Sequence, residues 1–175
     1  MTSPTDMKQH FTNQELTKIQ GRPTRTSLST LWKELKANLR KIYSTNGCGT
    51  RGHLRLFYGL TAYNALPTMT ANKWVDPVHS GATPVIPIGA NQTTVNRILQ
   101  EYKSNLLMFN TQETAIHICT QMVMNAVEVT YYQALEDPDE GYAEVNLINI
   151  MDHLNDQKTQ MKDMRKSISS TSWTT

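Results

Sequence analysis

Apolar residues recur every three or four positions over residues 28–43, the pattern of a helix with one buried face. These positions are Leu28, Leu31, Trp32, Leu35, Leu39, Ile42 and Tyr43. Ser29 or Thr30 can cap the start of the helix. The polar turn 44–49 follows, and its Asn and Gly residues are typical of helix ends. The opposite face carries Lys and Arg, so the sequence predicts an amphipathic helix with a basic outer face.

The remaining apolar pattern is also helical. Residues 51–58 read either as a short extended segment or as the start of a helix, and 61–66 read as a short helix stopped by Pro67. A helix is predicted over 93–109, and Asn110 with Glu113 resembles a capping box that opens a second long helix. A last helix is predicted over 145–154. The predicted fold class is all-α, a compact bundle of five or six helices.

A long Pro-rich loop interrupts the helices at residues 67–90. Its prolines exclude a regular helix, and the apolar Val85, Ile86 and Ile88 are expected to pin the loop onto the domain. Loops longer than about 15 residues are usually functional or interaction features. The candidate interface residues in this loop are Trp74, Pro77, His79, Pro84, Ile86 and Pro87.

The ends of the chain are more polar than its centre. Residues 1–27 show no sustained period and contain Pro4, Gly21 and Pro23, so they are expected to form a flexible polar arm with room for a short helix near 13–19. The helical domain is placed at 28–155. A polar, Ser/Thr-rich tail follows at 156–175.

Charge is distributed unevenly along the 175 residues. Residues 1–55 hold ten Lys and Arg against three Asp and Glu, while 56–175 hold seven against twelve, so a basic first third precedes an acidic remainder. The basic candidates for binding nucleic-acid phosphates are Lys33, Lys36, Arg40, Lys41, Arg51 and Arg55. A solvated outer face explains the four cations of residues 33–41 equally well, and an acidic surface of a second copy is another partner that fits.

Candidate chemistry gathers in the turn after the first strong helix. Residues 47–52 match G-x-G-x-x-G, but they follow a helix rather than a strand, so a tight turn built by Gly47, Gly49, Gly52 and His53 is favoured over a nucleotide site. Cys48 lies close to His53 in sequence, as in a small Cys/His enzyme, yet no third orienting residue can be named. Zinc-ligand spacing is lacking, and the acidic residues 136–140 are read as a solvated turn. We therefore expect no enzyme activity, cofactor or metal.

Two further features bear on the setting of the protein. The chain lacks an apolar run of about 18 residues, so no membrane partner is expected. Cys48 and Cys119 lie far apart in sequence, which favours reduced thiols in a cytoplasmic or nuclear compartment.

Four segments, in order, resemble one family. The turn S-T-N-G-C-G-T-R-G-H-L at 44–54 is similar to the S-T-x-G-G-G-x-x-G-H-L segment of Gag polyproteins of copia-type LTR retrotransposons, in the form found in diatoms and other algae. The other three are the Trp-Pro-His-Gly-Pro-Ile-Pro pattern at 74–87, the helix at 97–109, and A-V-E-x₂-Y-x₂-A-L at 126–135 with a helix ending at His153-Leu154. The resemblance covers about 28–155. Cys48 departs from it, since the family has Gly there.

The resemblance implies a fold like the N-terminal lobe of a retrotransposon capsid. It also implies a structural protein that self-associates into a homo-oligomeric, cytoplasmic virus-like particle and packages RNA. The chain stops where related Gag proteins continue into a second lobe. An active element, a fragment and a domesticated copy used as a nucleic-acid-binding or regulatory module therefore all remain open as readings.

Overall fold

The helix α2 (Arg25–Lys41) supplies the central face of the core. Here the fold is taken from a computed structural model that describes residues 4–44, 46, 51–67 and 73–157. One stripe of α2 is almost fully buried, with exposed fractions of 2% or less at Leu28, Leu31, Leu35 and Leu39. The helix begins earlier than predicted because Thr24 is the cap: Thr24 Oγ1 accepts from Ser27 N, and Ser27 Oγ accepts from Thr24 N at 2.8 Å.

The N-terminal segment packs on this core. A short helix, α1 (Pro4–Gln9), lies ahead of the predicted 13–19, and the side chains of Met7, Phe11, Leu16 and Ile19 are all buried. The expectation of a flexible arm over 1–27 is therefore wrong for the part that the structure describes. The four apolar residues are spaced by four, five and three positions, which matches no single helix or strand period.

Polar contacts fix the segment between α1 and α2. The buried Asn38 side chain accepts from Asn13 N at 2.8 Å and donates to Asn13 O at 2.7 Å. The Glu34 carboxylate accepts from the backbone N and the hydroxyl of Thr17 at 2.8 and 2.6 Å. Ile19 N donates to Ala126 O at 2.7 Å. Residues 13–19 are thus held as an extended strap across two helices.

The longest element is α5 (Gln92–Ala126), with 35 residues and a length of about 52 Å. Asn91 caps it by accepting from Thr94 N at 2.9 Å. The predicted break at Asn110 is wrong, because α5 continues through it without a Gly or Pro. Only the second half of α5 contributes to the core, through the buried residues Ala115, Ile118, Cys119, Met122, Val123 and Ala126.

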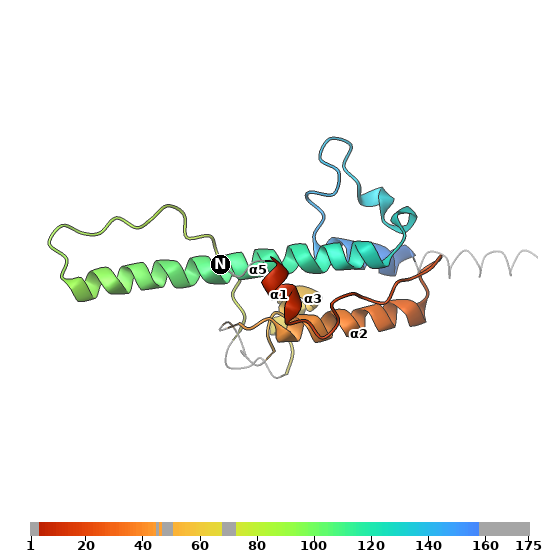
Figure 1. Cartoon of the computed structure of the whole chain (residues 1–175), viewed down its shortest axis with the longest axis horizontal. Helices are drawn as coiled ribbons and strands as arrows, with labels where there is room; N and C mark the ends of the chain where they lie inside the picture. The colour runs from red at the N-terminus through yellow and green to blue at the C-terminus, as the bar shows by residue number, and fades with distance from the viewer. Residues whose placement is uncertain (1–3, 45, 47–50, 68–72, 158–175) are drawn as a thin grey trace, which may run out of the picture.

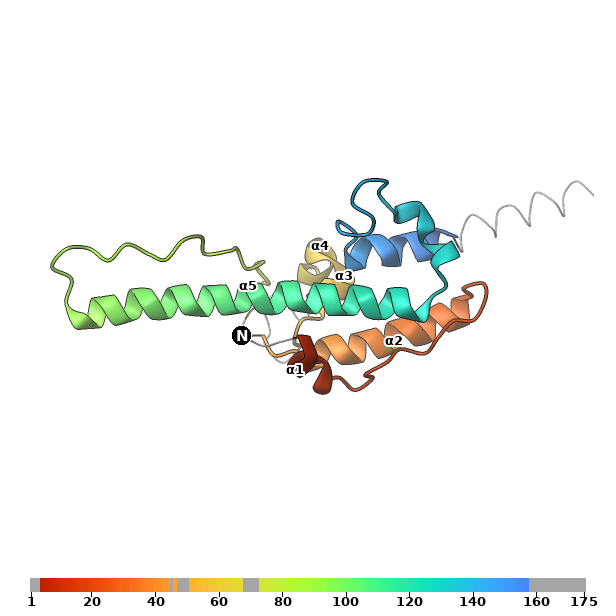
Figure 2. The same cartoon turned by 45° about the horizontal axis from the view of Figure 1, so that its top comes forward.

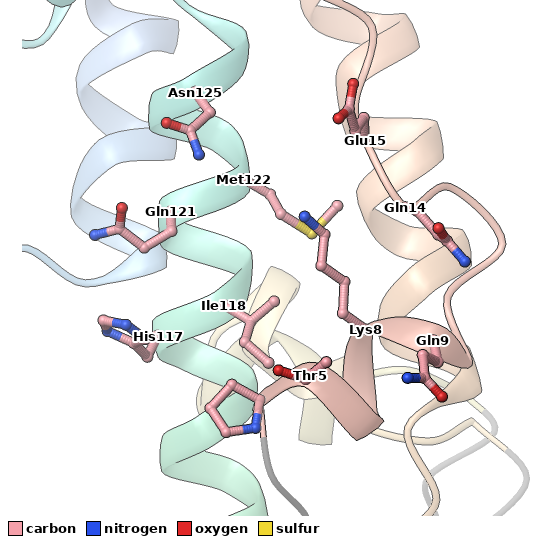
Figure 3. Close-up of a pocket in the computed structure, with 11 residues that line it drawn as sticks. Thr5, Lys8, Gln9, Gln14, Glu15, His117, Ile118, Gln121, Met122 and Asn125 are labelled. Atoms are coloured by element: carbon pink, nitrogen blue, oxygen red, sulfur yellow. The ribbon is translucent and has the colours of Figure 1, made fainter.

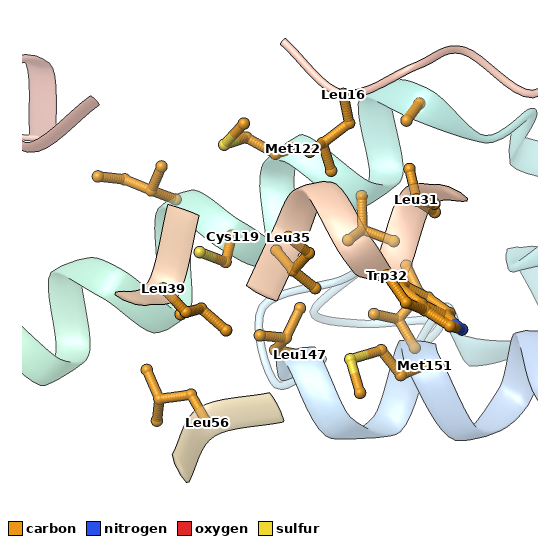
Figure 4. Packing of buried hydrophobic residues seen from close by; sticks show 14 of the residues in the cluster. Leu16, Leu31, Trp32, Leu35, Leu39, Leu56, Cys119, Met122, Leu147 and Met151 are labelled. Carbon is orange, nitrogen blue, oxygen red and sulfur yellow. The ribbon is translucent and has the colours of Figure 1, made fainter. Parts of the chain in front are cut away.

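Short helices complete the structure. The ambiguous segment at 51–58 is helical, as α3 (Arg55–Tyr58), and Gly59 with φ +75° separates it from α4 (Leu60–Asn64). After α5 come two 3-10 turns, η1 (Val129–Tyr131) and η2 (Gln133–Leu135), and a helix over 147–157. Leu35 and Leu39 meet Cys119 and residues of this last helix in the core (Figure 4). Within the described residues there are six α-helices and no strand, which confirms the all-α prediction.

Two segments leave this helical body. Residues 75–91 lie alongside the first half of α5, and the two together project away from the other helices (Figures 1 and 2). At the other end of α5, residues 128–146 form a loop that contains the acidic turn, closed by Asp137 N donating to Gly141 O at 2.7 Å. The predicted tail from 156 lies, beyond residue 157, outside the described residues.

Candidate assembly surface

Trp74 is an anchor inside the protein. Its side chain is only 2% exposed, and its ring lies edge-on to those of His53 and Tyr63, with centroids 5.4 and 6.0 Å away. Asn64 holds its backbone, accepting from Trp74 N at 2.8 Å and donating to Trp74 O at 2.9 Å. Trp74 is therefore not the exposed residue that was expected in an interface loop: it fixes the start of the loop to α4.

The Asp76 carboxylate is the common partner of the polar groups around Trp74. Its carboxylate accepts from Trp74 Nε1 at 3.0 Å and forms an ion pair with Arg55. Gln112 Nε2 donates to the same carboxylate at 3.4 Å. The Arg55 side chain is 14% exposed, so the prediction that Arg55 binds phosphate is wrong in this structure. Nothing in the sequence pattern singled out Asn64, Asp76 or Gln112, because all of their contacts except the one between Asp76 and Trp74 join residues 10 to 36 positions apart.

The turn before α3 depends on glycine at Gly52. Its φ is +53°, and a Cβ there would lie 2.5 Å from Ile42 O and 2.6 Å from Leu39 O. The next residue, His53, is buried; its N donates to Leu39 O at 2.9 Å, and its Nδ1 lies 3.2 Å from Ile42 O. Burial lowers the pKa of His53. Gly52 and His53 thus lie in a tight turn, as predicted from the sequence. Gly47, Cys48 and Gly49 lie outside the described residues.

Residues 75–111 form a projecting unit that we call the spur. It consists of the extended segment 75–91 and the first half of α5, side by side (Figure 2). Tyr102 Oη donates to Gly81 O at 3.2 Å, and the His79 ring packs edge-on against Phe109 with centroids 5.1 Å apart. These contacts hold the extended segment to the helix. One edge of the His79 ring is thus in contact with α5, although the residue as a whole remains exposed.

No residue of the spur is buried. Val85 is 92% exposed, Ile88 107% and Ile86 39%, so the expectation that these three pin the loop to the domain is wrong. Pro77 and Pro84 are half-buried and Pro87 is exposed. Residues 77–96 contain no Lys, Arg, Asp or Glu, and the four charged residues of the spur lie outside that range. The stretch 77–96 is thus an uncharged, partly apolar part of the spur, and the apolar side chains that were expected to turn inward are exposed there.

A small hollow lies where the spur meets the body. We call it the socket. It has a volume of about 130 Å³, with walls from Trp74, Pro77 and Met108 and a rim that includes Tyr43 and Leu107. Tyr43 is 78% exposed and Leu107 51%. Leu107 does not fall on the apolar face predicted for the helix at 93–109. An apolar residue off that face was the only feature of the sequence that indicated this rim.

The basic face of α2 is retained in part. Lys33, Arg40 and Lys41 are exposed. Lys36 instead places its Nζ 4.7 Å from the Phe57 ring centroid, a cation–π contact. Arg51 is half-buried. Three of the six predicted cations thus point freely to solvent.

A larger hollow lies between parts of α1 and the second half of α5 (Figure 3). Its volume is about 440 Å³; Ile118 and Met122 line it beside polar side chains that include Lys8, Glu15 and His117. Within the described part of the chain, no group of three or more His, Cys, Asp or Glu could hold a metal. Burial raises the pKa of Cys119 to about 12, which removes that thiol as a nucleophile.

Comparison with known proteins adds no relative: neither a family model, nor a curated protein, nor a solved structure matches the chain. Among the described helices, none is both long enough and apolar enough to cross a membrane.

Proposed function

We propose that this protein is a structural, capsid-like protein that associates with copies of itself through the spur. The single observation that carries the proposal is the absence of any buried residue over 75–111. A helix exposed on most sides is unusual unless its apolar positions meet a partner. The absence of Lys, Arg, Asp and Glu over 77–96 favours contact of this stretch with protein over contact with a polyanion.

The resemblance of 44–54 and 74–87 to copia-type Gag supports the same proposal. Those segments supply the His53 turn and the Trp74 anchor, which position the base of the spur. In this proposal the protein is not an enzyme. It assembles as a cytoplasmic homo-oligomeric particle, and its lobe corresponds to the N-terminal lobe of a capsid.

Light scattering coupled to gel filtration tests self-association. The mass should rise with protein concentration, at low and at high salt, because an apolar contact resists screening. The double variant Val85→Ser/Ile88→Ser should lower the mass at equal concentration. Val129→Ser is the matched control, because Val129 is 50% exposed but lies off the spur. A strict monomer at every concentration and salt would refute the proposal.

RNA packaging is the second candidate, favoured by the exposed cations of α2. Lys33, Arg40 and Lys41 have no carboxylate partner among the described residues. The triple charge reversal of these residues to Glu should weaken RNA binding in a filter assay and flatten its dependence on salt. Lys103→Glu, an exposed position on the spur, is the control. Equal binding by the wild type and the triple variant would remove this candidate.

A further inference from the structure

The end of the spur has a conformationally restricted backbone and apolar side chains. Residues 84–88, which we call the tip, read Pro-Val-Ile-Pro-Ile. The two prolines fix φ at their positions, so the tip loses little conformational freedom when it is held by a partner. A turn closes the tip, with Ala90 N donating to Pro87 O at 3.1 Å and Gly89 at φ +82°. Val85 and Ile88 therefore project into solvent from a constrained backbone.

The socket matches the tip in size and in chemistry. Apolar cavities near 150 Å³ accommodate a molecule the size of benzene, so the socket at about 130 Å³ has room for one branched apolar side chain. Its apolar walls are an indole, a proline ring and Met108, whose thioether chain adapts to the shape of a ligand, and polar residues from the turn after α2 and from α5 complete the lining. No Lys, Arg, Asp or Glu lines it. Insertion of an uncharged tip would therefore desolvate no charge.

The tip cannot reach the socket of its own chain. The tip lies next to Gln92, where α5 begins, whereas Leu107 at the socket is 15 residues further along the same straight helix. That separation is about 22 Å along the helix axis. The occupant has to come from another molecule, and a second copy carries the matching tip.

We propose that the tip of one copy inserts into the socket of the next, with Ile88 or Val85 as the inserted side chain. This inference rests on the proposed self-association and specifies its two surfaces. The surfaces differ, so the contact is heterologous: in a pair, one copy retains a free socket and the other a free tip. Such contacts extend into rings or filaments.

Dimensions indicate how strong one contact is. The helical half of the spur is about 30 Å long and about 10 Å wide, and the extended segment widens it by about 5 Å. One face then presents on the order of 500 Å², below the roughly 800 Å² per partner of a standard stable interface. A single contact should therefore be weak, and a closed or repeated assembly gains its stability from several contacts together.

The experiment mixes two variants that are each defective on one side. Ile88→Asp disables the tip, and Ser104→Trp fills the socket from an exposed position on α5. Leu107→Glu, at the exposed rim, is a second socket variant in case the tryptophan perturbs folding. Gln100→Glu, at an exposed position that lines neither surface, controls for added charge on the spur. Circular dichroism verifies that each variant is folded, and sedimentation velocity measures the size.

Each defective variant alone should associate at least about tenfold more weakly than the wild type, since burial of one apolar side chain is lost. An equal mixture should form a one-to-one dimer that grows no further, because one intact tip meets one intact socket. Because a single contact is weak, the mixture is measured over a concentration series up to its solubility. If the wild type assembles but the mixture sediments no faster than either variant alone throughout that series, or Ile88→Asp assembles normally, the tip-in-socket contact is wrong and self-association stands. If the wild type is itself monomeric, the proposed function fails first.

Discussion

The Asn64 side chain forms two hydrogen bonds with the backbone of Trp74: it accepts from Trp74 N at 2.8 Å and donates to Trp74 O at 2.9 Å. This pair joins α4 to the first residue of the chain that leads into the spur. The spur itself has no buried side chain. Its orientation therefore depends on a few contacts at its base, of which this clamp is the most direct.

Replacing Asn64 with Ala should destabilise the protein by about 2 kcal/mol, because two hydrogen bonds are lost and two backbone groups of a buried residue are left without partners. Urea unfolding measures the change, and limited proteolysis should cut the 75–91 segment faster. Asn105→Ala, at an exposed position of α5, should stay within about 0.5 kcal/mol of the wild type. Equal unfolding midpoints for the two variants would show that the clamp does not stabilise the fold.

Gly52→Ala and Gly81→Ala form a matched pair. Both glycines have positive φ, which costs an alanine about 1–2 kcal/mol. At Gly52 the added Cβ would also meet three backbone oxygens at 2.5–2.7 Å, whereas at Gly81 nothing lies within 4 Å. Gly52→Ala should therefore be destabilised by more than about 3 kcal/mol in denaturant unfolding, and Gly81→Ala by about 1 kcal/mol. Similar losses at both positions would contradict the close approach at Gly52.

Stability should fall on the acid side of neutrality because of His53. Burial lowers the pKa of His53 in the folded protein below its ordinary value of 6.5. The unfolded chain then takes up the proton first, so the contribution is complete above pH 6.5 and is lost as the pH falls from there toward the folded-state pKa. Unfolding free energies at pH 7.5 and 5.5 should differ less in His53→Gln than in the wild type, and His117→Gln, at an exposed position, should leave the difference unchanged.

Cys119 should resist thiol reagents in the native protein. It is fully buried, and burial raises the pKa of its thiol to about 12. In a Cys48→Ser background, labelling at pH 8 should be slow without denaturant and fast in denaturant, because only the unfolded chain exposes the thiol. Mass spectrometry reports the extent of labelling. Rapid native labelling would show that the core between α2 and α5 opens easily.

Helices are predicted well from the sequence where the helical repeat alone determines which side chains are buried. Leu28 to Leu39 repeat at helical spacing, and the structure buries that stripe. The capping box at Asn110 failed because such a box is a local signal, while helix continuation depends on the apolar residues after it. The strap at 13–19 was missed because it is held by residues distant in sequence: Asn38 in α2 bonds to Asn13, and Ala126 in α5 bonds to Ile19.

For the candidate site, composition identified the loop but not the direction of its side chains. Trp74 and Val85 are both large, apolar and close to proline, yet one is 2% exposed and the other 92%. Asn64, in a separate short helix, decides the first case, and the distance of the tip from the core decides the second. Neither cause is encoded near the residue that it affects.

One continuous helix runs from the core to the end of the spur, so α5 acts as a lever. Its second half is clamped between α2 and the last helix, while its first half projects freely. Over an arm of about 30 Å, a tilt of one degree at the clamp displaces the far end by about 0.5 Å. The packing of Cys119 and Val123 therefore sets the angle between neighbouring copies in the proposed assembly. Core substitutions that barely change stability should alter its curvature.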